Sequence, residues 1–147
     1  MGEPMKTRWL RLLAVSVALS GCMHGRLSGL ATPAPDEQVA EVVVIRTSNV
    51  FGATNSFLIT VDGHRAWGIR VGEHARLKVV AGAHRVGVEC FGGWAPIWRE
   101  SDAAEVRVEA NAIAYLLVSP DLDCASIKAI TDEAGRDWLG RTTPSSP

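Results

Sequence analysis

The chain has 147 residues, a formal net charge of −1 and a hydrophobic content of 47%, and a chain of this length is expected to form one domain. Beyond residue 21 it carries 12 basic and 15 acidic residues without any block of like charges. This balance argues against nucleic acid and anionic lipid headgroups as partners.

The first 21 residues have the layout of a secretory signal peptide. Three basic residues precede an apolar run over 12–19, and the small residues Ser20 and Gly21 follow. This order of a positive, an apolar and a small-residue region is typical of a signal for export. The apolar run has about half of the ~20 residues needed to cross a bilayer as a helix. We therefore expect residues 1–21 to be removed rather than to span a membrane.

The four residues Leu19-Ser-Gly-Cys22 resemble the lipobox of bacterial lipoproteins. In a lipobox, the cysteine sulfur receives a diacylglycerol, the signal peptide is cut before the cysteine, and the new amino group is acylated. The resemblance implies that Cys22 is the lipidation site, and two or three acyl chains on one residue hold a protein stably at a membrane. The alternative is an ordinary signal peptide cut elsewhere, with Cys22 as an incidental thiol.

Met23 stands where lipoproteins kept at the inner membrane usually carry aspartate. The lipobox resemblance therefore implies a cell-envelope protein anchored in the outer membrane and facing the periplasm.

Two segments that flank the apolar part of the sequence lack a hydrophobic period. Residues 22–38 are rich in Gly, Ala, Pro and Ser, and residues 142–147 are similarly polar. Such stretches bury too little apolar surface to offset the entropy lost on ordering. We therefore expect a flexible tether at 22–38, one domain at 39–141 and a disordered tail at 142–147.

The domain has the pattern of a series of short strands. Apolar or alternating segments recur about every eight to twelve residues between Gly, Asn or Asp, which is typical of an all-β sandwich or barrel. The run Glu41–Arg46 has an apolar interior, as expected for a strand covered on both faces. Asp62-Gly63 is a strong signal for a type I′ hairpin turn. The expected strands are 41–46, 57–61, 67–71, 75–79, 86–90, 105–109, 113–119 and 125–130.

Eight strands in so short a domain leave little room for crossover helices, so we expect mainly antiparallel pairing. One helix is predicted over Thr131–Leu139, where a capping residue precedes two acidic residues and Ala134 and Trp138 share a face. Gly135 weakens this helix by up to ~1 kcal/mol. The predicted fold is an antiparallel β-sandwich of about seven to eight short strands, with Trp138 of one short C-terminal helix packed against the sandwich edge.

Several turn and core motifs follow one another along residues 41–139. They are Val44-Ile-Arg46 with Asn49-Val-Phe-Gly52, the hairpin Val61-Asp-Gly63, the turn Gly82-Ala-His84 and the segment Asn111–Leu116 around Tyr115. This series resembles a family of small bacterial lipoproteins with a PEGA-like, immunoglobulin-like β-sandwich domain of unknown function. Ile45, Ala81, Asn111 and Ala114 depart from that family's pattern. The resemblance implies the fold and assigns no catalytic residue.

With Cys22 acylated, Cys90 and Cys124 are the remaining cysteines, in a compartment where disulfides persist. We expect a disulfide between them that closes a loop of about 35 residues and stabilises the fold by roughly 4 kcal/mol in the chain-entropy model. The alternative is a catalytic Cys90 with a histidine base. Cys90 ends an apolar strand face, however, and the sequence places no acidic residue to orient such a base.

His64, His74 and His84 recur every ten residues, each after a turn, and three imidazoles suggest a zinc site. Successive turns of a meander lie at opposite ends, so His74 should lie a strand's length, roughly 20 Å, from the other two. Two ligands do not make a zinc site. We therefore expect surface histidines that flank turns, with no metal and no cofactor.

The stretch Phe91-Gly-Gly-Trp-Ala-Pro-Ile-Trp98 is rich in apolar residues without a strand period. Its large side chains are Phe91, Trp94, Ile97 and Trp98. Each aromatic residue carries about 150–250 Å² of surface, so the stretch should either fold over the sandwich end as a plug or offer a docking patch. We expect the plug. In the alternative arrangement these four residues are the candidate binding patch.

The sequence therefore favours a lipid-anchored, non-enzymatic periplasmic lipoprotein that acts as an accessory or binding module. Its expected partners are the membrane, through the anchor, and an envelope protein or a glycan. A second hypothesis is an envelope enzyme that uses Cys90 or a histidine together with Asp121 or Asp123. A third is a purely structural lipoprotein.

Overall fold

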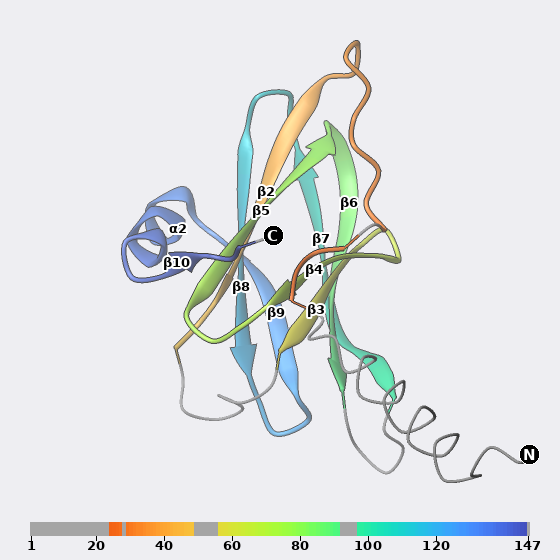
Figure 1. Cartoon of the computed structure of the whole chain (residues 1–147). Coiled ribbons are helices and arrows are strands. Elements are labelled where there is room, and N and C mark those ends of the chain that lie inside the picture. The colour runs from red at the N-terminus through yellow and green to blue at the C-terminus, as the bar shows by residue number, and fades with distance from the viewer. Residues whose placement is uncertain (1–23, 28, 49–55, 92–96, 147) are drawn as a thin grey trace, which may run out of the picture.

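The computed structural model describes residues 24–27, 29–48, 56–91 and 97–146 (Figure 1). These residues form an all-β sandwich of two five-stranded sheets and one short helix. The strands are β1 (Gly25–Arg26), β2 (Val39–Arg46), β3 (Phe57–Val61), β4 (His64–Ile69), β5 (Glu73–Val80), β6 (Gly82–Phe91), β7 (Trp98–Val108), β8 (Ile113–Pro120), β9 (Ala125–Ile130) and β10 (Thr143–Pro144). The helix is α2 (Asp132–Leu139).

The first sheet has the strand order β1-β4-β3-β6-β7, and the second has the order β10-β5-β2-β8-β9. All eight predicted strands are present. Neighbouring strands are antiparallel, as expected, except β2 with β8 and β10 with β5. The pair of β2 and β8 is parallel because the chain enters both strands at the same end of the sandwich: Glu41 pairs with Ile113.

The predicted hairpin turn at Asp62-Gly63 is confirmed. The two residues have φ angles of 51° and 80°, the positive values that a type I′ turn requires. They join β3 to β4, and Val61 pairs with His64 across the turn.

Strand β2 is covered on both faces, as its continuous apolar run predicts. Val42 and Val44 are fully buried in the core between the two sheets. Val43 and Ile45 face the other way and are fully buried in a second cluster, against which Trp138 of α2 packs. Burying a large apolar side chain contributes about 1.5–3 kcal/mol, so this central strand is a main source of the fold's stability.

Helix α2 lies on the outer face of the second sheet, so the prediction that Trp138 packs against the edge of the sandwich is wrong. The helix begins as predicted after Thr131, whose Oγ1 accepts a hydrogen bond of 3.3 Å from the Ala134 backbone N–H. It covers β2 and β8 because their outward-facing side chains, including Tyr115, are apolar. Gly135 lies so close to Tyr115 that a β carbon there would overlap the ring.

Strand β7 begins at Trp98, well before the predicted start at residue 105. Its first half is polar and lacks an alternating apolar pattern, which is why the sequence did not reveal it. Two of these polar side chains bind the edge strand of the other sheet. Ser101 Oγ donates a 2.8 Å hydrogen bond to the Ala125 carbonyl oxygen, and Asp102 Oδ2 accepts a 2.9 Å bond from the Ile127 backbone N–H.

The described residues of the segment 22–38 are not a flexible tether, contrary to the prediction. Gly25 pairs with Gly68 of β4, and the Leu27 N–H donates a 2.8 Å hydrogen bond to the Ala66 carbonyl oxygen. Leu30 packs against the core. The segment is ordered because the free edge of β4 offers backbone groups that need partners. Cys22 itself lies outside the described residues.

The predicted disordered tail at 142–147 is also wrong for residues 142–146. Thr143 and Pro144 form β10 beside β5, and the Ser145 N–H donates a 2.9 Å hydrogen bond to the His74 carbonyl oxygen. Ser145 is only 8% exposed. Both ends of the described chain therefore cover the side of the sandwich where β4 and β5 meet.

Candidate functional site

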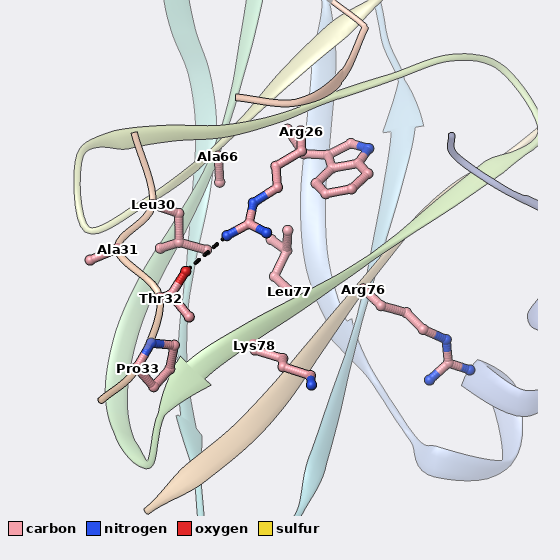
Figure 2. A pocket seen from close by; sticks show the side chains of 10 residues that line it. Arg26, Leu30, Ala31, Thr32, Pro33, Ala66, Arg76, Leu77 and Lys78 are labelled. Carbon is pink, nitrogen blue, oxygen red and sulfur yellow. Dashed lines mark hydrogen bonds between the residues drawn. The ribbon is translucent and has the colours of Figure 1, made fainter. Parts of the chain in front are cut away.

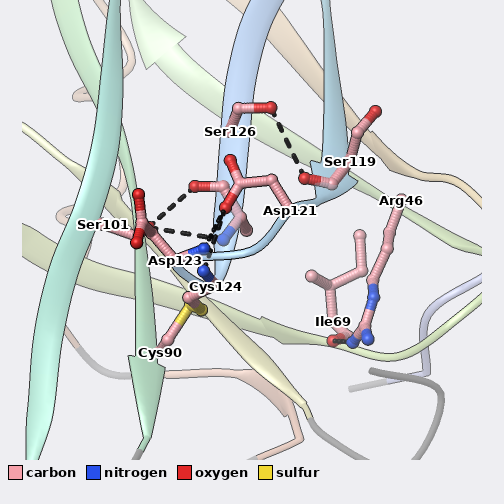
Figure 3. Close-up of a disulfide and its surroundings, with 10 residues drawn as sticks. Arg46, Ile69, Cys90, Ser101, Ser119, Asp121, Asp123, Cys124 and Ser126 are labelled. Carbon is pink, nitrogen blue, oxygen red and sulfur yellow. Dashed lines mark hydrogen bonds between the residues drawn. A yellow bond between two sulfur atoms is a disulfide. The ribbon is translucent and has the colours of Figure 1, made fainter. Parts of the chain in front are cut away.

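The sandwich is closed on the side of β7 and β9 by a disulfide between Cys90 and Cys124 (Figure 3). Cys90 lies on β6 of the first sheet, and Cys124 precedes β9 of the second, with 6.3 Å between their Cα atoms. The predicted pairing is confirmed. It rules out Cys90 as the nucleophile of the second hypothesis, because nucleophilic catalysis needs a thiolate.

Asp121, the proposed catalytic partner, has a structural role in the loop before β9. Its Oδ1 accepts hydrogen bonds from the backbone N–H groups of Asp123 at 3.0 Å and Cys124 at 2.9 Å. Figure 3 shows these bonds beside the disulfide. An aspartate that caps its own loop in this way fixes the turn, and here the turn places Cys124 for bonding. Asp123 is exposed in the same loop.

His84 holds the start of β6 against the β3–β4 turn. Its Nδ1 lies 2.8 Å from Asp62 Oδ2, and its Nε2 lies 2.6 Å from the Val80 carbonyl oxygen. Both partners are acceptors, so the doubly protonated imidazolium satisfies both bonds. Partial burial lowers the pKa of His84, but the bonds to Asp62 and Val80 outweigh burial and raise the pKa above its usual value. Neither ring nitrogen is left to act as a base.

His74 is buried, only 7% exposed, and is thus not the surface histidine that we expected. It is covered by the C-terminal segment, where the Thr142 hydroxyl donates a 3.0 Å hydrogen bond to the Trp138 carbonyl oxygen. The His74 Nδ1–H therefore donates to Thr142 Oγ1, 2.9 Å away. Burial, together with the positive charge of Arg76, lowers the pKa of His74 and favours the neutral ring. His64 is exposed, and the described residues contain no group of three or more potential metal ligands.

Arg46 occupies the inner face at the end of β2 and is fully buried. Its Nη1 donates a 3.1 Å hydrogen bond to the Ile69 carbonyl oxygen, and its guanidinium lies 3.8 Å from the centre of the Phe57 ring. Burial lowers the pKa of Arg46 to about 10, although the negative charge of Glu73 acts in the other direction and raises it. The side chain therefore stays charged at neutral pH. It ties β2 to β3 through the cation–π contact with Phe57 and to β4 through the hydrogen bond to Ile69.

In the aromatic stretch 91–98, the structure describes Phe91, Ile97 and Trp98. Phe91 is 52% and Ile97 57% exposed, so the predicted plug is wrong for these two residues. Trp98 is partly buried, and its ring lies 5.4 Å from that of Phe91. Trp94 lies outside the described residues. The exposure of Phe91 and Ile97 is consistent with the alternative arrangement, in which these side chains are part of a candidate binding patch.

The side of the sandwich opposite the disulfide contains a cleft of about 420 Å³ between β4 and β5, bordered by Arg26 and residues 30–33 (Figure 2). It is lined by the apolar and polar residues Leu30, Ala31, Thr32, Pro33, Ala66, Trp67 and Leu77 and by the cationic residues Arg26, Arg76 and Lys78. Figure 2 shows the Arg26 guanidinium turned toward Thr32, whereas the Arg76 side chain extends away from the cleft. A volume of this size lies in the range of about 300–1,000 Å³ that is usual for small-ligand sites.

The three cations of the cleft differ in how far they are neutralised. Arg76 forms an ion pair of 2.5 Å with Glu41, whereas Arg26 donates a 3.0 Å hydrogen bond to the uncharged Thr32 Oγ1. Lys78 has no carboxylate within 4.0 Å among the residues that the structure describes. Because two positive charges are left uncompensated beside apolar walls, the cleft favours a ligand that combines an acidic group with an apolar face.

Sequence reasoning missed this cleft. Its lining comes from Arg26, residues 30–33, residues 66–67 and residues 76–78, and the segment 22–38 was expected to be a tether. The apolar residues Leu27 and Leu30 within that segment were the available signal, because a solvated tether has no need of them.

Comparisons of the chain with protein-family models, with curated proteins and with solved structures find no match. Within the described residues, no helix is both long enough and apolar enough to cross a membrane.

Proposed function

We propose that this protein is a lipid-anchored cell-envelope lipoprotein, acylated at Cys22, attached to the outer membrane and facing the periplasm. The observation that carries the proposal is the Cys90–Cys124 disulfide. It consumes both other cysteines, so Cys22 stands alone at the end of a stretch that resembles a lipobox. A disulfide between the two sheets also supports export, because such bonds persist in oxidising compartments.

We further propose a non-enzymatic role as an accessory or binding module related to the PEGA-like lipoproteins. The two-sheet sandwich is consistent with that fold class. Support also comes from the groups that the enzyme hypothesis would use. Cys90 is oxidised, both ring nitrogens of His84 are bonded to acceptors, and Asp121 caps its own loop.

The partner that we propose for the cleft is a glycan that carries carboxylates. Lys78 and Arg26 supply positive charge, and Trp67, Leu30 and Leu77 supply apolar surface, which matches the two kinds of surface on an acidic sugar. A protein partner needs roughly 800 Å² of interface on each side, which a small cleft alone does not offer. An acidic protein segment is the competing partner.

Replacing Cys22 by alanine is expected to abolish membrane attachment. The wild-type protein should carry fatty acyl mass on its first residue, should be labelled by an alkyne-bearing palmitate analogue, and should sediment with membranes. The variant should lose the label and the acyl mass, because no other sulfur is free to receive a lipid. Intact-mass spectrometry and membrane fractionation measure both effects.

The control is the double variant Cys90→Ala with Cys124→Ala, which keeps Cys22 and should keep the label. If wild-type protein lacks acyl mass, or if Cys22→Ala is labelled as strongly as wild type, the proposed anchor is wrong.

Charge reversal at Lys78 tests the cleft. Tetragalacturonate should bind to the detergent-solubilised protein, and maltotetraose, an uncharged tetrasaccharide with the same α-1,4 linkage, should bind more weakly. Lys78→Glu should weaken tetragalacturonate binding by about fivefold, since a surface charge pair contributes up to about 1 kcal/mol. Isothermal titration calorimetry measures the change.

The matched control for this experiment is Lys128→Glu, the same charge change on exposed β9 away from the cleft. If both variants weaken binding equally, the cleft is not the site. Tighter binding of a hexaglutamate peptide than of the acidic sugar would place the partner among proteins.

A further inference from the structure

One end of the sandwich gathers four segments that are distant in the sequence; we call it the anchor end. The strand registers define it. Arg26 pairs with Trp67 and Gly25 with Gly68, so the chain arrives at β1 from the end where β4 finishes at Ile69. The Arg70–Glu73 turn, the end of β6 at Phe91 with the start of β7, and the 121–124 loop lie at the same end (Figure 1).

Exposed apolar side chains are concentrated at the anchor end. Among the described residues, Leu122 is the most exposed large apolar side chain, at 103%, and it joins Phe91 at 52% and Ile97 at 57%. The other two exposed large apolar residues, Val80 and Ile113, are only 37% and 39% exposed. They lie at the opposite end of the sandwich, where Val80 pairs with Val39 and Ile113 with Glu41.

We propose that the anchor end rests on the membrane surface and inserts Phe91, Ile97 and Leu122 into the interfacial layer of the lipid. This inference rests on the proposed acylation of Cys22. It assigns a lipid surface to these three side chains as their binding partner.

The geometry brings the three side chains within reach of an anchored membrane. Cys22 precedes His24 by two residues, which span at most about 7 Å, and His24 Nε2 is held 3.6 Å from Glu73 Oε1. From β1 to β6 the sheet crosses three strand spacings, about 14 Å at ~4.8 Å each. An acylated Cys22 would therefore hold the end of β6 and the start of β7 close to the lipid, because no long linker separates the anchor from the domain.

The disulfide makes the surface a single unit. Phe91 directly follows Cys90, and Leu122 lies two residues before Cys124, so the Cys90–Cys124 bond fixes the apolar tips of both loops relative to each other. The rings of Phe91 and Trp98 pack in a tilted arrangement with 5.4 Å between their centres, which links the end of β6 to the start of β7. Tryptophan, which has an apolar ring and a polar N–H, is favoured at the level of lipid headgroups, and Trp98 lies beside Phe91.

Charge does not select the lipid. Arg70 and Arg99 are exposed on the segments of the anchor end, and Asp121 and Asp123 flank Leu122. Glu100 is also exposed there, but its charge is paired with that of Arg85. Two basic and two acidic residues leave no field to attract anionic headgroups. Burial of apolar surface is then the driving force, and uncharged phosphatidylcholine is a sufficient test membrane.

The test uses the full acylated protein reconstituted in phosphatidylcholine vesicles whose acyl chains carry bromine near the headgroups. Bromine should quench part of the tryptophan emission, and this part should disappear when Trp94 and Trp98 are both replaced by phenylalanine. The triple variant Phe91→Ser, Ile97→Ser, Leu122→Ser should show the emission found in bromine-free vesicles. All substituted side chains of the triple variant are exposed, and its unfolding transition should match that of wild type.

The matched control is Val80→Ser with Ile113→Ser, which removes exposed apolar residues from the opposite end and should be quenched like wild type. Absence of quenching in wild type, or equal quenching in the triple variant, overturns the inference while the acyl mass on Cys22 stays intact. Absence of acyl mass instead overturns the proposed function. The two failures are therefore distinct.

Discussion

Replacing Cys90 and Cys124 together by alanine is expected to lower the free energy of unfolding by about 4 kcal/mol. The disulfide closes a loop with a sequence separation of 34 residues, and in the chain-entropy model a loop of this length restricts the unfolded chain by that amount. Small domains have about 5–15 kcal/mol of stability, so the variant should unfold at a much lower denaturant concentration. Urea unfolding followed by circular dichroism measures the difference.

Wild-type protein reduced with dithiothreitol provides the control, because it loses the same constraint without loss of side-chain volume. The reduced protein and the double variant should unfold at similar urea concentrations. A loss below about 1 kcal/mol in both would mean that Ser101, Asp102 and the core already hold the sheets together, and that the constraint on the unfolded chain counts for little here.

Gly135→Ala is expected to destabilise the protein by about 1–2 kcal/mol, the reverse of its usual effect. In an exposed helix, alanine is favoured over glycine by up to about 1 kcal/mol. Here, a β carbon on α2 would overlap the ring of Tyr115, and an overpacked contact costs about 1–3 kcal/mol. The helix must shift, and Trp138 must leave part of its contact with β2 and β8. Thermal unfolding measures the loss.

Gly140→Ala is the matched control at the end of the same helix. Gly140 has φ −66°, and the nearest atom to an added β carbon is the Asp137 carbonyl oxygen at 3.4 Å. Alanine should therefore be accommodated, with a stability within about 0.5 kcal/mol of wild type. If Gly135→Ala behaves like Gly140→Ala, helix α2 does not pack as closely on Tyr115 as described.

The strands could be predicted because their signals are local. Strands β3 and β9 match their predicted ranges, 57–61 and 125–130, since alternating apolar residues end at clear turns. The disulfide followed from the number of cysteines. The first half of β7 was missed because its polar residues bind β9, a long-range contact that leaves no period in the sequence.

The candidate sites were harder to predict because they depend on how distant segments meet. Nothing near Leu122 in the sequence shows that it shares an end of the sandwich with Phe91. The cleft requires Arg26 and residues 30–33 to pack beside β4, whereas the composition of the segment 22–38 is that of a linker. Propensity describes what a segment does alone, whereas the free edge of β4 determines what this segment does in the fold.

The parallel partnership of β2 and β8 also affects how the chain reaches its native state. The valine-rich strand β2 emerges early, yet Ile113–Pro120, which covers one of its edges, emerges late. While the chain is being synthesised or exported from its N-terminus, this edge of β2 stays unpaired until β8 has emerged. An unpaired apolar strand edge slows folding and promotes aggregation. Folding without aggregation therefore depends on keeping each unfinished chain apart from other chains until almost the whole sequence has emerged.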